Sequence, residues 1–338
     1  MEPSADLRPL TKSCGAFAAA ALFVLSSVQA QQSAWQDPSP HTTRLVEVDE
    51  GVRLEVLDWG GSGRPLVLLA GGGDTAHVFD DFAQKLAPGF HVVGITRRGF
   101  GASGYSASHV GPDRLADDVL AVLDALEISR PVLAGHSIAG QELSSIANRT
   151  PARAAGLVYL DAGYPYAFDN GKGPAWKDFQ ITGPQPPPPA GADLAGFDAL
   201  RQYYRRVLGF TYPEAELRQQ RDAGPDGRVG KPHDFPGYAT LLSGMKKHAR
   251  IPVPALVIFA NPHGLGNWID DSADPKVRDA AHAYAATLTA LTSRQAKAIE
   301  DAVPTARVVT LPGAHHYVFL SNEADVLREL RAFVGALP

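Results

Sequence analysis

Cysteine is almost absent from the sequence: Cys14 is the one cysteine among 338 residues. A single thiol excludes an internal disulfide framework and a cysteine-rich metal site. The sequence also lacks an excess of positive charge, since the net charge is −5 and the lysines and arginines are scattered. Without a basic footprint we expect no nucleic-acid partner. The remaining composition, 45% apolar and 20% charged, is typical of a globular chain that builds a core.

The first 30 residues have the pattern of a secretory signal. Arg8 and Lys12 precede an apolar run over residues 16–25, and Val28-Gln29-Ala30 supplies small residues for cleavage. The run is too short to span a bilayer. We therefore expect residues 1–30 to be a signal peptide and the protein to be periplasmic or secreted, with no stable membrane anchor after cleavage. The alternative is an uncleaved anchor. If the signal is removed, the mature chain lacks cysteine.

Strand-like and helix-like segments alternate after a short leader over residues 31–42. Two segments with alternating apolar residues surround a turn at Glu50-Gly51, as in an antiparallel hairpin. Continuous apolar runs follow, which is typical of parallel strands covered on both faces. The eight expected strands are residues 44–48, 53–59, 65–70, 91–95, 131–134, 157–160, 255–260 and 306–311. The main helical patterns cover residues 112–126, 276–303 and 323–337. This order predicts an α/β fold with a doubly wound, mostly parallel eight-stranded sheet.

One long segment interrupts this alternation. Residues 163–251 contain no strand-like run and begin with a proline-rich stretch. Helical patches lie near residues 198–207 and 213–221. We expect a mainly helical lid inserted into a catalytic domain formed by residues 43–162 and 252–338. The alternative is a disordered linker, against which stands an apolar stripe made of Phe197, Leu200, Tyr203, Tyr204, Val207 and Leu208.

The segment with the clearest chemistry is residues 131–142, in which an apolar strand runs into Gly135-His136-Ser137 and then into a helix. A serine on such a strand-to-helix turn is held with strained backbone angles above the carboxyl edge of the sheet. The motif resembles the nucleophile elbow of the α/β-hydrolase family, with Ala139 in place of the last glycine and Gly140 after it. The alternative is an ordinary strand–turn–helix junction that carries a surface serine.

Two further segments strengthen the resemblance. Gly71-Gly72-Gly73-Asp74 follows the strand at residues 65–70, where the family has its oxyanion loop. By that resemblance, the N–H groups of Gly72 and Ile138 would stabilise an oxyanion. Residues 97–104 resemble the family's Arg-Gly turn, to which we assign only a structural role.

The general base is expected just after the last strand, in the turn that contains His315 and His316. His316 matches the family's position for this histidine, and His315 is the competitor. The family's usual acid position, Asn261-Pro262-His263-Gly264, holds no carboxylate. Asp161, directly after the strand at residues 157–160, is the favoured acid because a strand end holds a side chain rigidly. Asp270 and Asp271 on the later loop are the alternatives.

The resemblance therefore implies a serine hydrolase that cleaves small carboxylic esters or lactones through an acyl-enzyme intermediate, with Ser137, His316 and Asp161 as its triad. Tyr164, Tyr166 and Phe168 suggest an apolar substrate pocket, unless they form the core of the lid. We expect neither a metal nor an organic cofactor, because His233, His248, His263 and His282 are too dispersed for a zinc site. The sequence leaves the oligomeric state open.

Other activities of the same fold remain open at this stage. A proline-releasing aminopeptidase would need lid carboxylates to hold a substrate ammonium, and the lid offers Glu214, Glu216, Asp222 and Asp226. A cofactor-free perhydrolase or haloperoxidase would use the same triad. Epoxide hydrolases and dehalogenases use an aspartate nucleophile, so Ser137 argues against both. A non-catalytic ligand-binding protein is the alternative from a different class.

Overall fold

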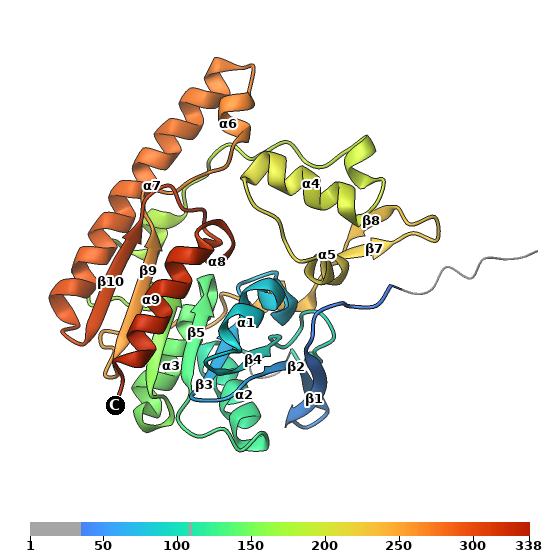
Figure 1. The fold of residues 1–338 in the computed structure, drawn as a ribbon. Helices are drawn as coiled ribbons and strands as arrows, with labels where there is room; N and C mark the ends of the chain where they lie inside the picture. Colours follow the sequence, from blue (N-terminus) through green and yellow to red (C-terminus); the bar gives the residue numbers. More distant parts are fainter. Residues whose placement is uncertain (1–34, 108–109) are drawn as a thin grey trace, which may run out of the picture. The chain divides into compact units, whose positions relative to one another are not determined.

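The computed structural model describes residues 35–107 and 110–338. The chain divides into two units, residues 1–37 and residues 38–338, and every element below belongs to the second (Figure 1). The expected signal peptide, residues 1–30, lies outside the described residues. Within the described part, no helix combines the length and the apolar character that crossing a membrane requires.

The second unit is built on an eight-stranded sheet with the order β1-β2-β4-β3-β5-β6-β9-β10. The first two strands and the β2–β4 pair are antiparallel, and the remaining pairs are parallel. The strands are β1 (Thr42–Asp49), β2 (Val52–Gly60), β3 (Pro65–Leu69), β4 (His91–Ile95), β5 (Val132–His136), β6 (Gly156–Leu160), β9 (Ala255–Ala260) and β10 (Ala306–Leu311). The prediction of a doubly wound, mostly parallel sheet with an antiparallel start is confirmed.

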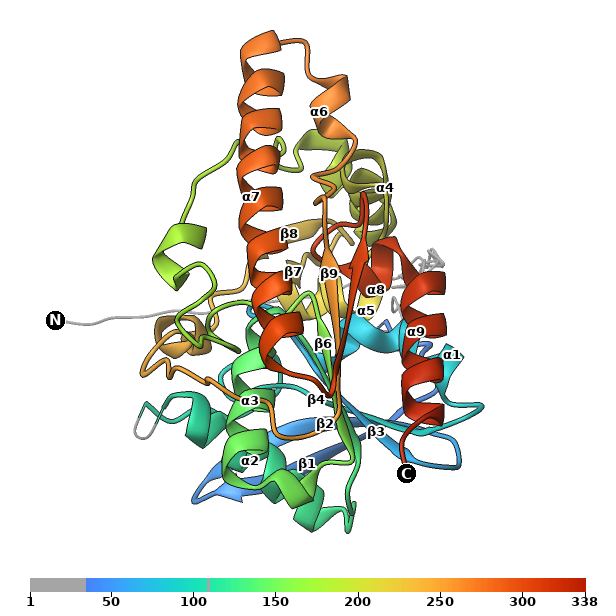
Figure 2. The same cartoon turned by 90° about the vertical axis from the view of Figure 1, so that its left-hand side faces the viewer.

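Helices cover both faces of the sheet because the side chains of each central strand point alternately to the two sides. Leu66 and Leu68 of β3 pack with α1 and α9, whereas Val67 and Leu69 pack with α2, α3 and α7. Figure 2 shows these two helical layers on opposite sides of the strands. The α-helices outside the long insertion are α1 (Asp80–Leu86), α2 (Pro112–Ala125), α3 (Gly140–Arg149), α6 (Trp268–Asp271), α7 (Pro275–Ala302), α8 (Val318–Ser321) and α9 (Glu323–Gly335).

The insertion between β6 and β9 contains α4 (Phe197–Leu208), α5 (Glu214–Gln220) and several 3-10 turns. Leu200, Tyr203 and Val207 of the predicted apolar stripe are buried on one side of α4. The insertion also contains a small hairpin, β7 (Arg221–Ala223) and β8 (Val229–Pro232), which the sequence analysis did not predict. Strands of three and four residues are too short to produce a readable alternation.

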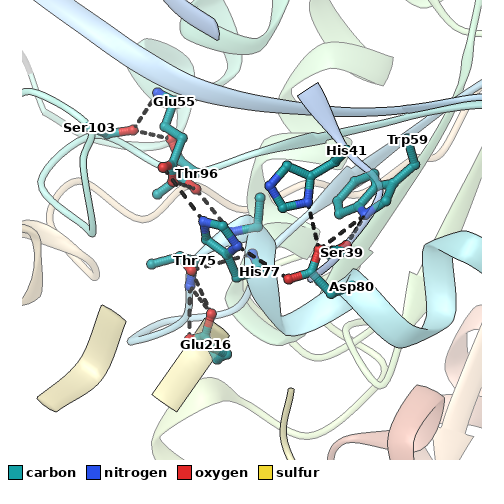
Figure 3. A network of polar contacts seen from close by, with 11 residues as sticks. Ser39, His41, Glu55, Trp59, Thr75, His77, Asp80, Thr96, Ser103 and Glu216 are labelled. Atoms are coloured by element: carbon teal, nitrogen blue, oxygen red, sulfur yellow. Dashed lines mark hydrogen bonds and ion pairs between the residues drawn. The ribbon is translucent and has the colours of Figure 1, made fainter. Parts of the chain in front are cut away.

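The predicted flexible leader, residues 31–42, is described only in part, and its last residues are held firmly. Ser39 Oγ donates a hydrogen bond to Asp80 Oδ1 (2.7 Å), and His41 Nδ1 lies 3.0 Å from the same oxygen. The indole N–H of Trp59 also donates to it, at 3.0 Å. Figure 3 shows this network of polar contacts around Asp80. At Ser39 and His41, therefore, the expectation of a flexible leader is wrong, because both side chains contact the buried carboxylate of Asp80.

Candidate active site

Ser137 sits at the sharp turn between β5 and α3. Its φ is +53°, in the left-handed region that non-glycine residues rarely adopt. The turn closes because its neighbours are small: a Cβ at Gly140 would lie 2.2 Å from the Ala162 carbonyl oxygen. A Cβ at Gly135 would come within 3.0 Å of the Ala139 Cβ. Ala139 therefore fits at the position where the family pattern has glycine, and the backbone has the geometry of a nucleophile elbow.

The structure brings Ser137, His316 and Asp161 into one hydrogen-bonded chain. His316 Nε2 lies 2.9 Å from Ser137 Oγ, and His316 Nδ1 lies 2.6 Å from Asp161 Oδ2. These three residues come from three different loops that follow β5, β6 and β10. Parallel strands present their carboxyl ends at one edge of the sheet, and this arrangement explains how residues more than 150 positions apart meet.

Asp161 is fully buried and, like Ser137, has a left-handed backbone, with φ +46°. Its Oδ1 accepts hydrogen bonds from the Tyr164 hydroxyl (2.8 Å) and the Ala260 N–H (3.0 Å). Burial alone would raise the pKa of Asp161, but His263 and His316 outweigh burial and hold the pKa well below its usual range. Asp161 is therefore an ionised, rigidly held partner for His316.

The alternative site residues lie elsewhere. Asp270 and Asp271 are exposed on α6, and Asp161 is the carboxylate that bonds to His316 in the described part of the chain. His315, the competitor for the base, accepts a hydrogen bond from the Tyr317 N–H and packs against Phe210. Burial, with the neighbouring charge of His316, lowers the pKa of His315 to about 3. Ser137 therefore faces His316 and not His315.

The glycine loop after β3 lies beside the elbow. A Cβ at Gly72 would be 3.5 Å from the Ile138 side chain, so the two expected oxyanion donors are on neighbouring segments. Arg97 holds this loop by donating hydrogen bonds to the carbonyl oxygens of Ala70 and Gly71, each at 2.9 Å. Its Nε also donates to Glu142 of α3, at 2.6 Å. The Arg-Gly turn, to which the sequence analysis gave only a structural role, thus positions the oxyanion loop against the elbow.

The insertion is fastened to the same loop through Glu216 of α5. Both the N–H and the hydroxyl of Thr75 donate to this carboxylate, at 3.1 and 2.5 Å (Figure 3). Gln220 Nε2 also donates to it, at 2.7 Å. Burial and the nearby charge of Asp74 raise the pKa of Glu216 above its usual range. Glu216, one of four carboxylates that could have held a substrate ammonium, thus ties the insertion to the loop after β3.

Two histidines near the triad were not predicted. His136 lies behind the catalytic loop, where its Nε2 donates to the His316 carbonyl oxygen (3.1 Å) and its ring packs on that of His316. His263 lies in the loop after β9, with Nε2 only 3.1 Å from Asp161 Oδ2. From the sequence His263 was considered only as a possible zinc ligand, and its contact with Asp161 was missed. The signal was its place in the Asn261–Gly264 stretch, where the family usually has its acid.

A cavity of about 510 Å³ opens at Ser137 and His316. Its walls are mainly aromatic and aliphatic, and they include Tyr164, Tyr166, Trp176, Phe179, Trp268 and Tyr284. Phe168, predicted as a third pocket residue, is only 1% exposed and packs in the core beneath α3 and α7, so that expectation was wrong. Among the described residues that line this cavity, none is a lysine, arginine, aspartate or glutamate.

Two groups of described residues bring potential metal ligands together: His41 with His77 and Asp80, and Asp161 with His263 and His316. In both groups the carboxylate oxygens lie within hydrogen-bond distance of the histidine nitrogens. These contacts satisfy the hydrogen-bonding needs of the buried carboxylates in both groups.

The sheet order, the strained serine elbow and the Ser–His–Asp chain are together the features of an α/β hydrolase. The model of the alpha/beta hydrolase family matches residues 66–329, and the chain belongs to this family. It is 31% identical to epoxide hydrolase A of Mycobacterium tuberculosis over 214 residues, which are 58% of this chain and 65% of the relative. It is 33% identical to a bifunctional esterase/perhydrolase of Acinetobacter calcoaceticus over 110 residues, or 31% of this chain and 39% of the relative.

These matches cover between about a third and two thirds of the curated relatives' own lengths. Among solved structures, E-2-(acetamidomethylene)succinate hydrolase superposes with a TM-score of 0.60 at 18% identity, covering 88% of this chain and all of that one. At this identity the likeness shows the shared fold.

Proposed function

We propose that this protein is a serine hydrolase that cleaves carboxylic esters or lactones of small, uncharged and largely apolar molecules. The observation that carries the proposal is the continuous hydrogen-bonded chain from Ser137 through His316 to Asp161, at the mouth of the 510 Å³ cavity. A serine hydroxyl is a poor nucleophile unless a base removes its proton, and His316 Nε2 is in hydrogen-bond contact with it.

The geometry supplies each step of acyl transfer. Ser137 Oγ attacks the substrate carbonyl carbon while His316 Nε2 takes its proton, and Asp161 stabilises the imidazolium that forms. The N–H groups of Gly72 and Ile138 stabilise the tetrahedral oxyanion. His316 then returns the proton to the leaving alkoxide, which departs as the alcohol. Water then attacks the acyl carbon while His316 Nε2 takes its proton, and His316 returns that proton to Ser137 Oγ as the acid leaves.

The charge of the cavity supports an uncharged substrate. Because no lysine, arginine, aspartate or glutamate is among the described residues that line it, a substrate carboxylate or ammonium would lose its hydration without gaining an oppositely charged partner. Three of the four lid carboxylates that an aminopeptidase could use are engaged elsewhere: Glu216 accepts from Thr75, Glu214 pairs with Arg218, and Asp222 lies beside His233. We therefore favour esters and lactones over peptides with a free N-terminus.

The direct test is labelling with a fluorophosphonate, followed by mass spectrometry. We expect one adduct on Ser137 in the wild type and none in Ser137→Ala, because only an activated serine reacts. A wild-type protein that is folded but unlabelled would contradict the proposal and favour a non-catalytic binding protein.

The substrate class is tested with matched nitrophenyl esters that carry either a neutral acyl chain or the same chain ending in a carboxylate. We expect kcat/KM to be at least about tenfold higher for the neutral ester, because the cavity offers no partner for the charge. Equal or reversed values would refute the charge preference. Perhydrolysis is measured by adding hydrogen peroxide to the same assay.

We also propose that the protein is exported. The support is the charged, apolar and small-residue pattern of residues 1–30. Expression with the native N-terminus and sequencing of the recovered protein should give a start at Gln31. A start at the initiator methionine, in the cytoplasmic fraction, would contradict export.

A further inference from the structure

The carboxylate of Asp161 contacts two histidines through the same oxygen. Its Oδ2 lies 2.6 Å from His316 Nδ1 and 3.1 Å from His263 Nε2. An ionised carboxylate can only accept hydrogen bonds, so each imidazole must carry its proton on the nitrogen that faces Asp161. With Tyr164 and the Ala260 N–H on Oδ1, the carboxylate accepts four hydrogen bonds and has no exposed surface.

The second ring nitrogen of His263, Nδ1, is buried and makes no hydrogen bond, and the whole side chain is 6% exposed. A buried nitrogen without a partner costs less as a bare lone pair than as an N–H group that has left water. The contacts thus select one tautomer of His263, with the proton on Nε2 and directed at Asp161.

His263 lies in the loop after β9, where the family usually has its triad acid. The carboxylate of this protein, Asp161, instead follows β6. In the loop after β9 the chain has a histidine that donates a hydrogen bond, where the family usually has a carboxylate that accepts one. That donor contacts the same Asp161 oxygen that holds the catalytic histidine.

We propose that His263 is a positioning residue that tunes the catalytic base through Asp161. Its N–H draws negative charge from the oxygen shared with His316, and it fixes the direction of the carboxylate plane. Asp161 therefore stabilises the protonated form of His316 less strongly than an unshared carboxylate would. The kinetic test of this inference rests on the proposed hydrolase function, whereas the NMR test of the His263 tautomer does not.

Other titratable groups face this cluster, and none of them accounts for such an effect near neutral pH. His136 comes from β5 and His315 from the loop of His316; burial lowers the pKa of both, to about 3 for His315. Tyr164 and Tyr166 come from the segment after β6, and burial together with the charge of Asp161 raises their pKa values well above the usual one. All four are uncharged at neutral pH.

The kinetic test compares His263→Leu, which removes the N–H donor, with His263→Gln, whose amide can present an N–H at the same place. We expect the acidic limb of the kcat/KM profile to move up by about half a pH unit to one unit in His263→Leu. The limb should stay near the wild-type position in His263→Gln. The control is His315→Gln, a neighbouring buried histidine without a bond to Asp161, in which the limb should not move.

A purely structural role for His263 would lower kcat or stability in His263→Leu but leave the limb in place, and that result would overturn the proposal. A limb that moves equally in the Leu and Gln variants would also overturn it.

A second measurement needs neither a variant nor turnover. Nitrogen NMR of the wild-type imidazoles should show His263 protonated on Nε2, and a proton on Nδ1 would refute the proposal. If the wild type hydrolysed no ester, the proposed function would fail, but this tautomer would still decide the role of His263.

Discussion

Two buried carboxylates in this protein, Asp80 and Asp161, each lie between two histidines, yet their surroundings differ sharply. Asp80 contacts His41 and His77, and the three side chains are between 3% and 7% exposed. Asp161 contacts His263 and His316, and His316 is 37% exposed at the mouth of a cavity. The residue types are the same, so the chemical difference must come from what each imidazole meets on its other side.

On its other side, His77 meets a second carboxylate. Its Nε2 lies 3.6 Å from Glu55 Oε1, and its Nδ1 lies 3.2 Å from Asp80 Oδ2 (Figure 3). Burial lowers the pKa of His77, but the two carboxylates outweigh it and raise the pKa to about 10. A histidine that keeps its proton at neutral pH cannot act as a base. His316 instead meets a hydroxyl, which leaves its Nε2 available for proton transfer.

The largest expected contrast comes from removing each charge without changing the shape of the side chain. Asp161→Asn should lower kcat by about 10³- to 10⁴-fold, because an amide cannot stabilise the imidazolium of His316 and favours the wrong tautomer. Asp80→Asn should leave kcat of the folded protein within about twofold, since no reacting atom touches it. Ester turnover of both variants checks this pair. If Asp161→Asn kept most of its activity, Asp161 would not be the triad acid.

The second expected effect is on stability and concerns the Asp80 cluster. Asp80→Asn removes one of the carboxylates that hold the protonated His77, and we expect it to lower the free energy of unfolding by about 3 kcal/mol or more. Urea unfolding of the wild type and the variant measures the loss. A change below about 1 kcal/mol would mean that the Asp80 network contributes little to the fold.

The sequence predicted the frame of the molecule better than the details of its polar clusters. The eight strands and the elbow follow from local features, namely apolar runs and small residues around Ser137. Asp161 was chosen because a strand end is rigid, and it is the carboxylate that contacts His316. His263, in contrast, meets Asp161 from 102 residues away, and the one signal of this contact in the sequence is its place where the family usually has its acid.

The insertion shows the same limit. Glu216 is one of four carboxylates that the sequence offers in the insertion, and its hydrogen bonds from Thr75 are what mark it as a buried anchor. Phe168 failed as a pocket residue for the same reason: its sequence shows that it is aromatic, but the side to which it turns depends on how α3 and α7 pack around it.

The contributions of His77 and Asp161 to the stability of the fold should also depend on pH in opposite directions. His77 has a folded-state pKa of about 10 against an ordinary value of 6.5, so its stabilising contribution is complete below pH 6.5 and is lost as pH rises through 10. Asp161 has a lowered pKa, so its contribution is present above pH 3.8 and is lost as pH falls below that value.

The wild type should therefore lose stability between pH 6.5 and 10 more steeply than His77→Gln, which no longer binds that proton. Chemical denaturation at several pH values gives both slopes. Parallel slopes would show that His77 does not carry its proton in the folded protein.

The smallest expected effect comes from removing one neutral donor from each carboxylate. Tyr164→Phe takes a hydroxyl from Asp161 and Ser39→Ala takes one from Asp80, where the hydrogen bonds measure 2.8 and 2.7 Å. Each variant should lower the free energy of unfolding by about 1 to 2 kcal/mol, because each carboxylate retains its other donors. Only Tyr164→Phe should also lower kcat, by about two- to tenfold, since the hydroxyl helps to orient the acid that holds His316. If Ser39→Ala lowered kcat as much as Tyr164→Phe does, the two clusters would be coupled through the oxyanion loop, and the division between a structural and a catalytic histidine–carboxylate cluster would not hold.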